Sequence, residues 1–347
     1  MTCKIEFPFL WLSQLINGRP KPWEYFKISG LTVNAYEILQ KKKANENITK
    51  IGIHKFLGFN GFIMMDSGGF LFMKKSKILI HPRTILELYK KSRPDFGVIL
   101  DHPLNPNLSS EEIKRRQMIT LRNTKYMVKN YTGRNPELIP VIHGTTIKSV
   151  QWYLKKIKEI SDFNIYGIGS LVPSVFNSKG AGGIYNVIEI VTFVKKQLPN
   201  KKIHVFGVGS TLTMHLMFYA GADSVDSTGW RTKAAFGAIQ LPGIGDRYIT
   251  LKKRHTKYPN LSREEEKILE NCECPICKKF SLKELTQSFE KRAIHNSWVF
   301  QKELNIARKL LNEDEKEYEK YVENILKQTK FYKAFKFAKE VKLKYLN

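Results

Sequence analysis

An alternation of short apolar segments with helical patterns runs along the chain and leaves few folds open to it. The apolar segments are rich in β-branched and aromatic residues, and their lack of polar positions is typical of strands that are covered on both faces. The alternation predicts up to eight strands. We expect them at Phe62–Met65, Phe96–Leu100, Leu138–Ile142, Asn164–Ile168, Ile203–Val208 and Ser224–Val225, with weaker candidates at Ile5–Trp11 and Leu31–Val33.

Helical signals lie between these segments. The sequence SSEE at 109–112 offers Ser109 as an N-cap with Glu112 three residues later, which predicts the start of a helix. Apolar residues recur at helical spacing over 147–157 and again over 184–194. Strands that alternate with helices pair in parallel, and the chain has no glycine motif of a dinucleotide-binding fold. The pattern therefore predicts an α/β chain folded as a closed (β/α)8 TIM barrel.

Polar and glycine residues follow the expected strands at their C-terminal ends. In a barrel the loops after the strands converge on one mouth, so these residues are candidates for an active site. A single aspartate at a strand end is as often a helix N-cap or a turn former, and a lone histidine more often packs than reacts. Three aspartates above one barrel favour chemistry over those local roles. The residues are Asp66, Asp101, His143, Gly169, Ser170, Gly207, Gly209 and Asp226.

The charge of the chain narrows the class of partner. Lysine and arginine number 58 against 32 aspartates and glutamates, which gives a net charge of +26 over 347 residues. A surface of this sign attracts polyanions, and we expect nucleic acid, although an excess of lysine also arises from genome composition. The N-terminal apolar run is too short and too interrupted by charge for a signal peptide or a membrane span. We therefore expect an intracellular, cytoplasmic protein with no membrane partner.

Three of the four cysteines lie close together, in a spacing that suits a metal better than disulfides. Cys272, Cys274 and Cys277 supply three thiolates, and His295 follows after a gap. His255, upstream in a basic segment, is the second candidate for the fourth ligand. Four ligands of this kind suit tetrahedral Zn²⁺ and leave no open position for a water, so the zinc is expected to be structural. Buried free thiols are the alternative.

Two further segments have an unusual composition. The glycine-rich segment NSKGAGGIY at 177–185 follows an expected strand and lacks the lysine pattern of a phosphate-binding loop, so we expect a flexible barrel loop. From Lys327 to Lys342 a lysine recurs at every third position. A step of three residues drifts around an α-helix, so these lysines wind around it and form no single stripe. A solvated terminal helix and a nucleic-acid contact are both compatible with that pattern.

Three short segments occur in order along the chain: MDSGGF around Asp66, GADSVDS around Asp226, and CECPIC followed by HN at 295–296. In this order they resemble the guanine transglycosylases, a family that exchanges guanine for a 7-deazaguanine in a polynucleotide. The segments HVFGVG, VIHGT and VNAY are similar to the family more loosely. The resemblance spans roughly residues 31–300 and implies a TIM barrel with an embedded zinc subdomain, commonly in a homodimer.

The resemblance assigns roles to the site residues. Asp226 would be the nucleophile that forms a covalent intermediate with the sugar, and Asp66 the general acid and base for the departing and entering bases. Asp101 would accept hydrogen bonds from the donor edge of guanine. Exchange with retained configuration independently requires two displacements, hence one carboxylate as nucleophile and another for proton transfer. Further base contacts implied by the resemblance are Phe70 and Phe206 as a sandwich, Gly169 and Ser170 through their backbone, and His143 in place of a glutamine.

We expect three regions in the chain. A TIM-barrel catalytic core would occupy residues 1–265, a zinc-binding subdomain residues 266–300, and basic C-terminal helices residues 301–347. These helices would follow the zinc subdomain directly.

Departures from the family pattern bear on the substrate. Leu71 stands where the family usually has glutamine after the glycine pair, and the segment STGWRTKAAFG after Asp226 does not resemble that of the tRNA enzymes. These departures favour the relatives that insert 7-deazaguanine derivatives into DNA, so we expect DNA first and tRNA second. Two alternatives are a non-catalytic nucleic-acid-binding partner subunit and a barrel glycosidase that acts on carbohydrate.

Overall fold

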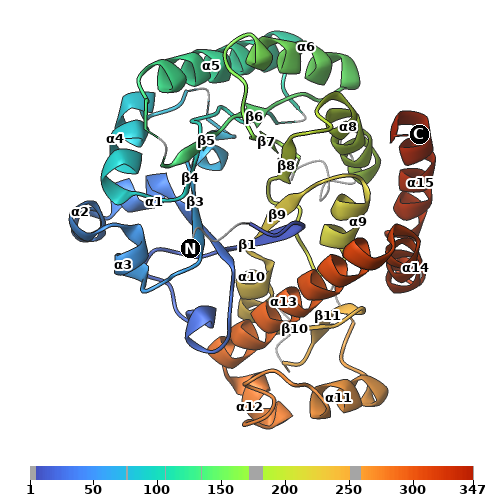
Figure 1. Cartoon of the computed structure of the whole chain (residues 1–347). Coiled ribbons are helices and arrows are strands. Elements are labelled where there is room, and N and C mark those ends of the chain that lie inside the picture. Colours follow the sequence, from blue (N-terminus) through green and yellow to red (C-terminus); the bar gives the residue numbers. More distant parts are fainter. Residues whose placement is uncertain are drawn as a thin grey trace.

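The computed structural model of the chain describes residues 5–75, 77–105, 107–133, 135–171, 183–250 and 259–346. Its centre is a ring of parallel strands with helices around it (Figure 1). The alternation in the sequence thus folds as the α/β barrel that it predicts. The strands are β1 (Phe9–Ser13), β2 (Gly30–Asn34), β3 (Phe62–Asp66), β4 (Phe96–Val98), β5 (Glu137–Ile139), β6 (Val141–Ile142), β7 (Ile165–Ile168), β8 (Lys202–Val205) and β9 (Ser224–Ser227).

The ring closes at a strand that a proline divides in two. The strands follow the order β5-β4-β3-β2-β1-β9-β8-β7-β6, so β5 and β6, consecutive in the chain, lie at its two ends. β5 pairs in parallel with β4, and β6 pairs in parallel with β7. Pro140 separates them because it has no N–H to donate, whereas its carbonyl accepts the Gly167 N–H at 2.9 Å. With β5 and β6 counted as one strand, the barrel has the eight expected.

Helices cover the outside of the ring (Figure 1). Helix α5 begins as predicted, because the Ser109 hydroxyl accepts the Glu112 N–H at 3.2 Å, and the stripe expected over 147–157 forms the buried face of α6. In the part of the chain that the structure describes, no helix has the length and apolar character needed to cross a membrane. The outer helices are α1 (Ala35–Gln40), α2 (Lys42–Ile51), α3 (Ile53–Leu57), α4 (Pro82–Ser92), α5 (Ser110–Lys129), α6 (Ile147–Lys158), α8 (Gly183–Gln197), α9 (Thr213–Tyr219) and α10 (Gly229–Ala235).

Two separate apolar cores stabilise the barrel. The larger lies between the strands and the outer helices. Because side chains alternate between the two faces of a strand, the residue two positions beyond an interior residue also points inward. That rule places Ser13, Asp66 and His143 above the interior core, at the ends of β1, β3 and β6. The smaller core fills the barrel interior with Phe9, Trp11, Met64, Phe96, Val98, Ile139, Val141 and Ile165.

Several strands differ from their expected bounds; β8, for example, ends at Val205 and not at Val208. β4 ends at Val98 and does not reach Leu100, because the backbone leaves the strand alternation there. Leu100 packs in the outer core, and its N–H lies 3.5 Å from the sulfur of Met127. Asp101 takes the inward position that the alternation would otherwise give to Leu100. β1 starts only after Pro8, which has no N–H for a neighbouring strand.

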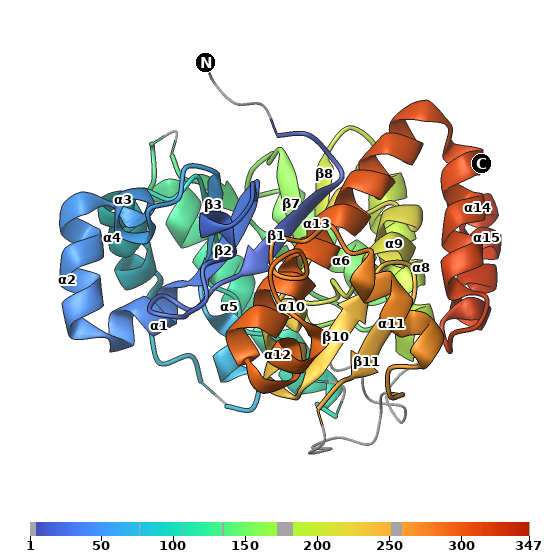
Figure 2. The same cartoon turned by 90° about the horizontal axis from the view of Figure 1, so that it is seen from below.

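A second region lies beside the barrel at one edge of the molecule (Figures 1 and 2). It comprises the antiparallel hairpin of β10 (Ala238–Leu241) and β11 (Gly245–Tyr248) with helices α11 (Arg263–Glu270) and α12 (Leu282–Gln287). Helix α13 (Phe289–Glu313) joins this region to the barrel, because it packs against β10, α10 and β1. The expected division of the chain at residues 265 and 300 stays a prediction; α13 is continuous across residue 300.

The last two helices, α14 (Glu315–Leu326) and α15 (Tyr332–Leu346), lie together beside α8 and α9 (Figure 2). Phe335 on α15 is fully buried there. Three lysines of α15 form ion pairs, Lys339 with Glu319, Lys342 with Glu315 and Lys344 with Glu189. Exposed ion pairs of this kind contribute little to stability, but they neutralise part of the positive charge of α15.

Candidate active site and metal centre

Three aspartates lie together at the mouth of the barrel, the end at which the parallel strands finish. Asp66 ends β3, Asp226 lies in β9, and Asp101 follows β4. The three carboxyl groups are close enough for the charges of Asp101 and Asp226 to raise the pKa of Asp66. β3 and β9 are separated in the sheet by β2 and β1, so only the curvature of the ring brings their ends together.

The pKa of Asp66 lies close to neutral pH. Burial at the mouth raises its pKa from 3.8 to about 7, and the charges of Asp101 and Asp226 add to this effect. Hydrogen bonds from the backbone N–H groups of Gly68 and Ser67 lower the pKa but do not offset the increase. The side chain remains partly exposed, so a ligand can reach it. A carboxyl group shared between its acid and base forms at pH 7 is suited to proton transfer in either direction.

The segment after Asp66 folds closely against Asp101. Asp101 is only 6% exposed, and its Oδ1 lies 3.5 Å from the Ser67 hydroxyl. A Cβ atom on Gly69 would lie 2.0 Å from the same oxygen, so only glycine allows the chain to pass this close. The serine and glycine that follow Asp66 therefore position the second carboxylate of the site.

Asp226 is held by groups from β1 and β8. The Gly207 N–H donates to its Oδ1 at 2.6 Å, and the Ser13 hydroxyl lies 3.5 Å from its Oδ2. Gly207 has a φ of +73°, a backbone conformation that other residues rarely adopt. The Nε2 of His204 lies 3.4 Å from Oδ1. The Asp226 carboxylate is thus oriented, while its side chain remains 15% exposed at the mouth.

His143 is completely buried and contacts Asp101. Its Nε2 lies 2.9 Å from Asp101 Oδ2, and its Nδ1 lies 2.8 Å from the Ser170 hydroxyl. The Ser170 hydroxyl also accepts the Leu104 N–H at 2.7 Å. A Cβ atom on Gly169 would lie 2.9 Å from the His143 ring, so glycine leaves room for the ring. The expected contacts of His143, Gly169 and Ser170 with a base stay predictions.

Two phenylalanines stand near the carboxylates. Phe70, on the short 3-10 helix η2 (Gly69–Phe72), is 58% exposed. Phe206 follows β8, is partly buried, and lies against Gly167, where a Cβ atom would meet its ring at 2.3 Å. An exposed phenylalanine four residues after the end of β3 is available for stacking against an aromatic ligand. The sandwich of a base between Phe70 and Phe206 stays a prediction.

Sequence reasoning missed three residues around Asp226. Ser13 and His204 contact Asp226, and Ser224 contacts His204. The alternation of side chains along β1 could have identified Ser13, since it is two positions beyond the inward-pointing Trp11. The strand was expected to end at Trp11, so Ser13 was left outside it.

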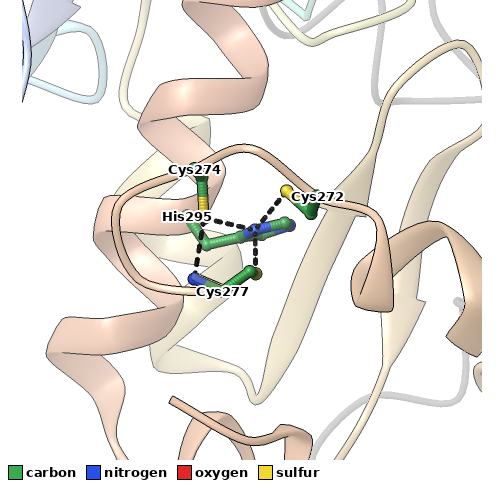
Figure 3. A group of neighbouring side chains, drawn as sticks. All are labelled: Cys272, Cys274, Cys277 and His295. Carbon is green, nitrogen blue, oxygen red and sulfur yellow. Dashed lines mark hydrogen bonds between the residues drawn. The ribbon is translucent and has the colours of Figure 1, made fainter. Parts of the chain in front are cut away.

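A separate group of metal-ligating side chains lies beside the barrel (Figure 3). Cys272, Cys274 and Cys277 come from the loop between α11 and α12, and His295 from α13. Their ligand atoms all lie within 4.8 Å of one another. Cys274 and His295 are fully buried. The cluster therefore consists of the four residues expected from the sequence, whereas His255 lies outside the described residues, as does most of the segment 177–185.

The geometry of this cluster fits tetrahedral zinc. The His295 Nδ1 lies 3.9, 3.5 and 3.3 Å from the sulfurs of Cys272, Cys274 and Cys277. Tetrahedral bonds of ordinary length to zinc place a nitrogen and a sulfur about 3.5 Å apart. The other ring nitrogen, Nε2, lies 2.8 Å from the Gln240 carbonyl, a contact that leaves Nδ1 free as ligand. The four residues can hold a structural zinc ion with no open position.

Comparison with known proteins identifies the family. A family profile described as "Queuine tRNA-ribosyltransferase" matches residues 20–330, most of the chain. The chain belongs to the queuine tRNA-ribosyltransferase family. The matched range includes Asp66, Asp101 and Asp226 as well as the four metal ligands.

Individual relatives agree with this family. The tRNA-guanine(15) transglycosylase of Methanococcus aeolicus is 32% identical over 297 residues, which is 82% of this chain and 42% of the relative. That of Pyrococcus furiosus is 28% identical over 305 residues, 85% of this chain and 48% of the relative. That of Methanocaldococcus jannaschii is 30% identical over 295 residues, 82% and 42% respectively. The chain thus spans less than half the length of each of these three relatives.

Proposed function

We propose that this family member exchanges guanine for a 7-deazaguanine in a polynucleotide, with tRNA as the leading substrate. The observation that carries the proposal is the convergence of Asp66 and Asp226 at one barrel mouth. Burial, the charge of Asp101 and the charge of Asp226 together raise the pKa of Asp66 to about 7. One carboxyl group is thereby suited to proton transfer while the other is available as a nucleophile.

The first displacement releases guanine. A carboxylate oxygen of Asp226 attacks the anomeric carbon of the target nucleotide, and the glycosidic C–N bond breaks. The electron pair of that bond stays on the guanine nitrogen, which takes the proton from Asp66. The product is an ester between Asp226 and the sugar. The Gly207 N–H, 2.6 Å from Oδ1, orients the attacking carboxylate before the reaction.

The second displacement attaches the new base. The ring N–H of the 7-deazaguanine gives its proton to the Asp66 carboxylate, and the nitrogen attacks the anomeric carbon from the opposite side. The ester bond breaks, and its electron pair returns to Asp226. Two successive inversions retain the configuration of the sugar, and both aspartates return to their starting protonation states.

Asp101 supplies recognition of the base. Its nearly buried carboxylate would accept hydrogen bonds from the ring N–H and the amino group of guanine. A carboxylate removed from water needs such donors, and the described protein offers it Ser67 at 3.5 Å and His143 at 2.9 Å. A base that lacks these two donors would leave the Asp101 carboxylate without hydrogen bonds that it needs. The site would therefore select strongly against such a base.

Zinc would contribute to structure and not to the exchange. With all four positions filled by protein ligands, the ion has no site for a substrate. It would tie the loop that contains Cys272, Cys274 and Cys277 to α13, which in turn packs against β1 and α10 of the barrel. The metal thereby supports the wall of the barrel next to Asp226.

The choice between nucleic acids rests on two sets of observations. A net charge of +26 supports a polyanionic substrate of either kind. The relatives reported above are named for tRNA, which favours tRNA over the DNA expected from the sequence. DNA is the second candidate, because Leu71 and His143 depart from the glutamines of the family pattern. The predicted homodimer stays a prediction that light scattering in solution would test.

A labelled-guanine exchange assay tests the function and separates the two nucleic acids. The protein is incubated with labelled guanine and, in parallel reactions, with tRNA or duplex DNA. We expect label to enter tRNA. Label in DNA alone would move the proposal to the second candidate, and label in neither would contradict it.

Trapping of the covalent intermediate tests the role of Asp226. The protein with its nucleic acid should form an adduct that persists on a denaturing gel, and Asp226→Ala should abolish it. The matched control is Asp162→Asn, which changes a carboxylate 77% exposed and paired with Lys201 on the surface. An undiminished adduct in Asp226→Ala would remove Asp226 as the nucleophile.

A further inference from the structure

Two buried histidines at the barrel mouth share one arrangement. His143 and His204 are 0% and 1% exposed, and each lies between a site aspartate and a serine. His143 Nε2 lies 2.9 Å from Asp101 Oδ2, and its Nδ1 lies 2.8 Å from Ser170 Oγ. His204 Nε2 lies 3.4 Å from Asp226 Oδ1, and its Nδ1 lies 2.9 Å from Ser224 Oγ. Asp66 takes part in no such contact with a histidine among the described residues.

The surroundings of Ser170 determine which nitrogen of His143 carries the hydrogen. The Ser170 oxygen accepts the Leu104 N–H at 2.7 Å, so its own hydrogen is free to point to His143 Nδ1. Ser170 also has a φ of +66°, an uncommon backbone conformation for serine, which a surrounding structure must stabilise. With Nδ1 as acceptor, the hydrogen of the neutral ring lies on Nε2, toward Asp101.

Ser224 gives the same result for His204. Its hydroxyl is buried, with the residue 3% exposed, and His204 Nδ1 is its hydrogen-bond partner in the described structure. A buried hydroxyl hydrogen needs an acceptor, and Nδ1 supplies one only when it carries no hydrogen itself. The hydrogen of His204 therefore also lies on Nε2, toward Asp226.

We propose that His143 and His204 are positioning residues for the exchange reaction, each directing an Nε2–H at one site carboxylate. His143 orients Asp101, which would bind the base, and His204 orients Asp226, which would attack the sugar. Ser170 and Ser224 hold the two rings in the tautomer that this requires. The kinetic part of this inference rests on the proposed function, whereas the tautomers and contacts do not.

The two Nε2 atoms have no other partner among the described residues. Neither makes an aligned hydrogen bond, although each is buried and within ion-pair distance of a carboxylate oxygen. A buried N–H left without an acceptor is strongly unfavourable, and a carboxylate is the strongest acceptor available. A small rotation of ring or carboxylate on ligand binding would align the contact.

This arrangement gives the three carboxylates different roles. His143 and His204 direct an N–H at Asp101 and Asp226, whereas Asp66 has no histidine contact among the described residues. Burial and the charges of Asp101 and Asp226 raise the pKa of Asp66 to about 7, so Asp66 is the carboxyl group suited to take up and release the proton.

The tautomers are tested by nitrogen NMR of the protein labelled at histidine. For His143 and His204 we expect Nδ1 without and Nε2 with a hydrogen. Asp101→Asn should shift the signals of His143 alone, and Asp226→Asn those of His204 alone. A hydrogen on Nδ1 in the unliganded protein, or no response to either variant, would overturn the inference even if exchange activity is present.

Kinetics separate the two histidines from each other. Loss of a buried hydrogen bond to a charged group changes the affected kinetic constant about 10- to 100-fold in the unfavourable direction. His143→Ala should raise the KM for guanine by this factor with little change in kcat, and His143→Gln, which keeps a donor, should restore most of it. His204→Ala should slow adduct formation by a similar factor at unchanged KM, with partial recovery in His204→Gln.

A control variant separates positioning from general destabilisation. His54→Gln changes a histidine that contacts Asp95 at 3.1 Å on the outside of the barrel, and it should alter neither constant. Ser170→Ala and Ser224→Ala remove only the hydroxyls and should repeat the two kinetic effects in weaker form. If His143→Ala and His204→Ala each changed kcat and KM by equal factors at unchanged melting temperature, the inference would be overturned. Absence of exchange in the wild type would instead count against the proposed function.

Discussion

Replacing Asp66 with asparagine should stabilise the protein at alkaline pH and leave its stability nearly unchanged at acidic pH. In the folded chain the pKa of Asp66 is raised from 3.8 to about 7 by burial, with contributions from Asp101 and Asp226. Between those two values the folded state holds a proton that the unfolded state has released. Stability therefore falls as pH rises from about 4 to about 7, and it levels off above that range.

The magnitude follows from the shift. A change of about three pKa units corresponds to about 4 kcal/mol, which is the upper limit of what the ionised Asp66 takes from the free energy of unfolding. The side chain is partly exposed at the mouth, so water screens the charge and we expect about half of that amount. Asparagine has no charge to bury, so Asp66→Asn should recover about 2 kcal/mol at pH 8 and close to none at pH 4.

Urea denaturation of both proteins at the two pH values measures this difference and needs no substrate. Asp162→Asn, at a carboxylate 77% exposed, is the matched control and should show no such gain with pH. The same difference between wild type and Asp66→Asn at pH 4 and pH 8 would refute the reasoning, because a carboxyl group of ordinary pKa would be ionised in folded and unfolded chains alike.

Three further outcomes are expected. Chelation of zinc, or Cys274→Ser, should lower the melting temperature in calorimetry, because the ion ties a loop to α13; unchanged melting would contradict a structural metal. Glu303→Gln removes the charged partner of the fully buried His215, 2.8 Å away, and should lower the free energy of unfolding by about 3–5 kcal/mol in urea titrations. A loss below about 1 kcal/mol would show that the pair is dispensable. Gly69→Ala would place a Cβ atom 2.0 Å from Asp101 Oδ1 and should weaken guanine binding about tenfold in equilibrium dialysis. Unchanged affinity would argue against Asp101 as the base-binding group.

The local elements of the fold could be predicted because their causes are local. The Ser109 cap of α5 and the apolar face of α6 each depend on residues a few positions apart. The cysteine cluster is similar, since three ligands lie in one short loop. The end of β4 could not be read in this way, because Leu100 leaves the strand to pack on Met127 of α5.

The amino-acid sequence by itself determined the class of fold, the zinc ligands and the aspartates at the strand ends, because spacing along the chain controls strands, helices and metal loops. Closure of the barrel decided which of those groups meet. Asp226 acquires Ser13 and His204 as neighbours only when β9 lies between β1 and β8, and the pKa of Asp66 rises only when three strand ends share one mouth. Such contacts depend on distances through space, and the electrostatic interaction between carboxylates has no counterpart in their separation along the chain.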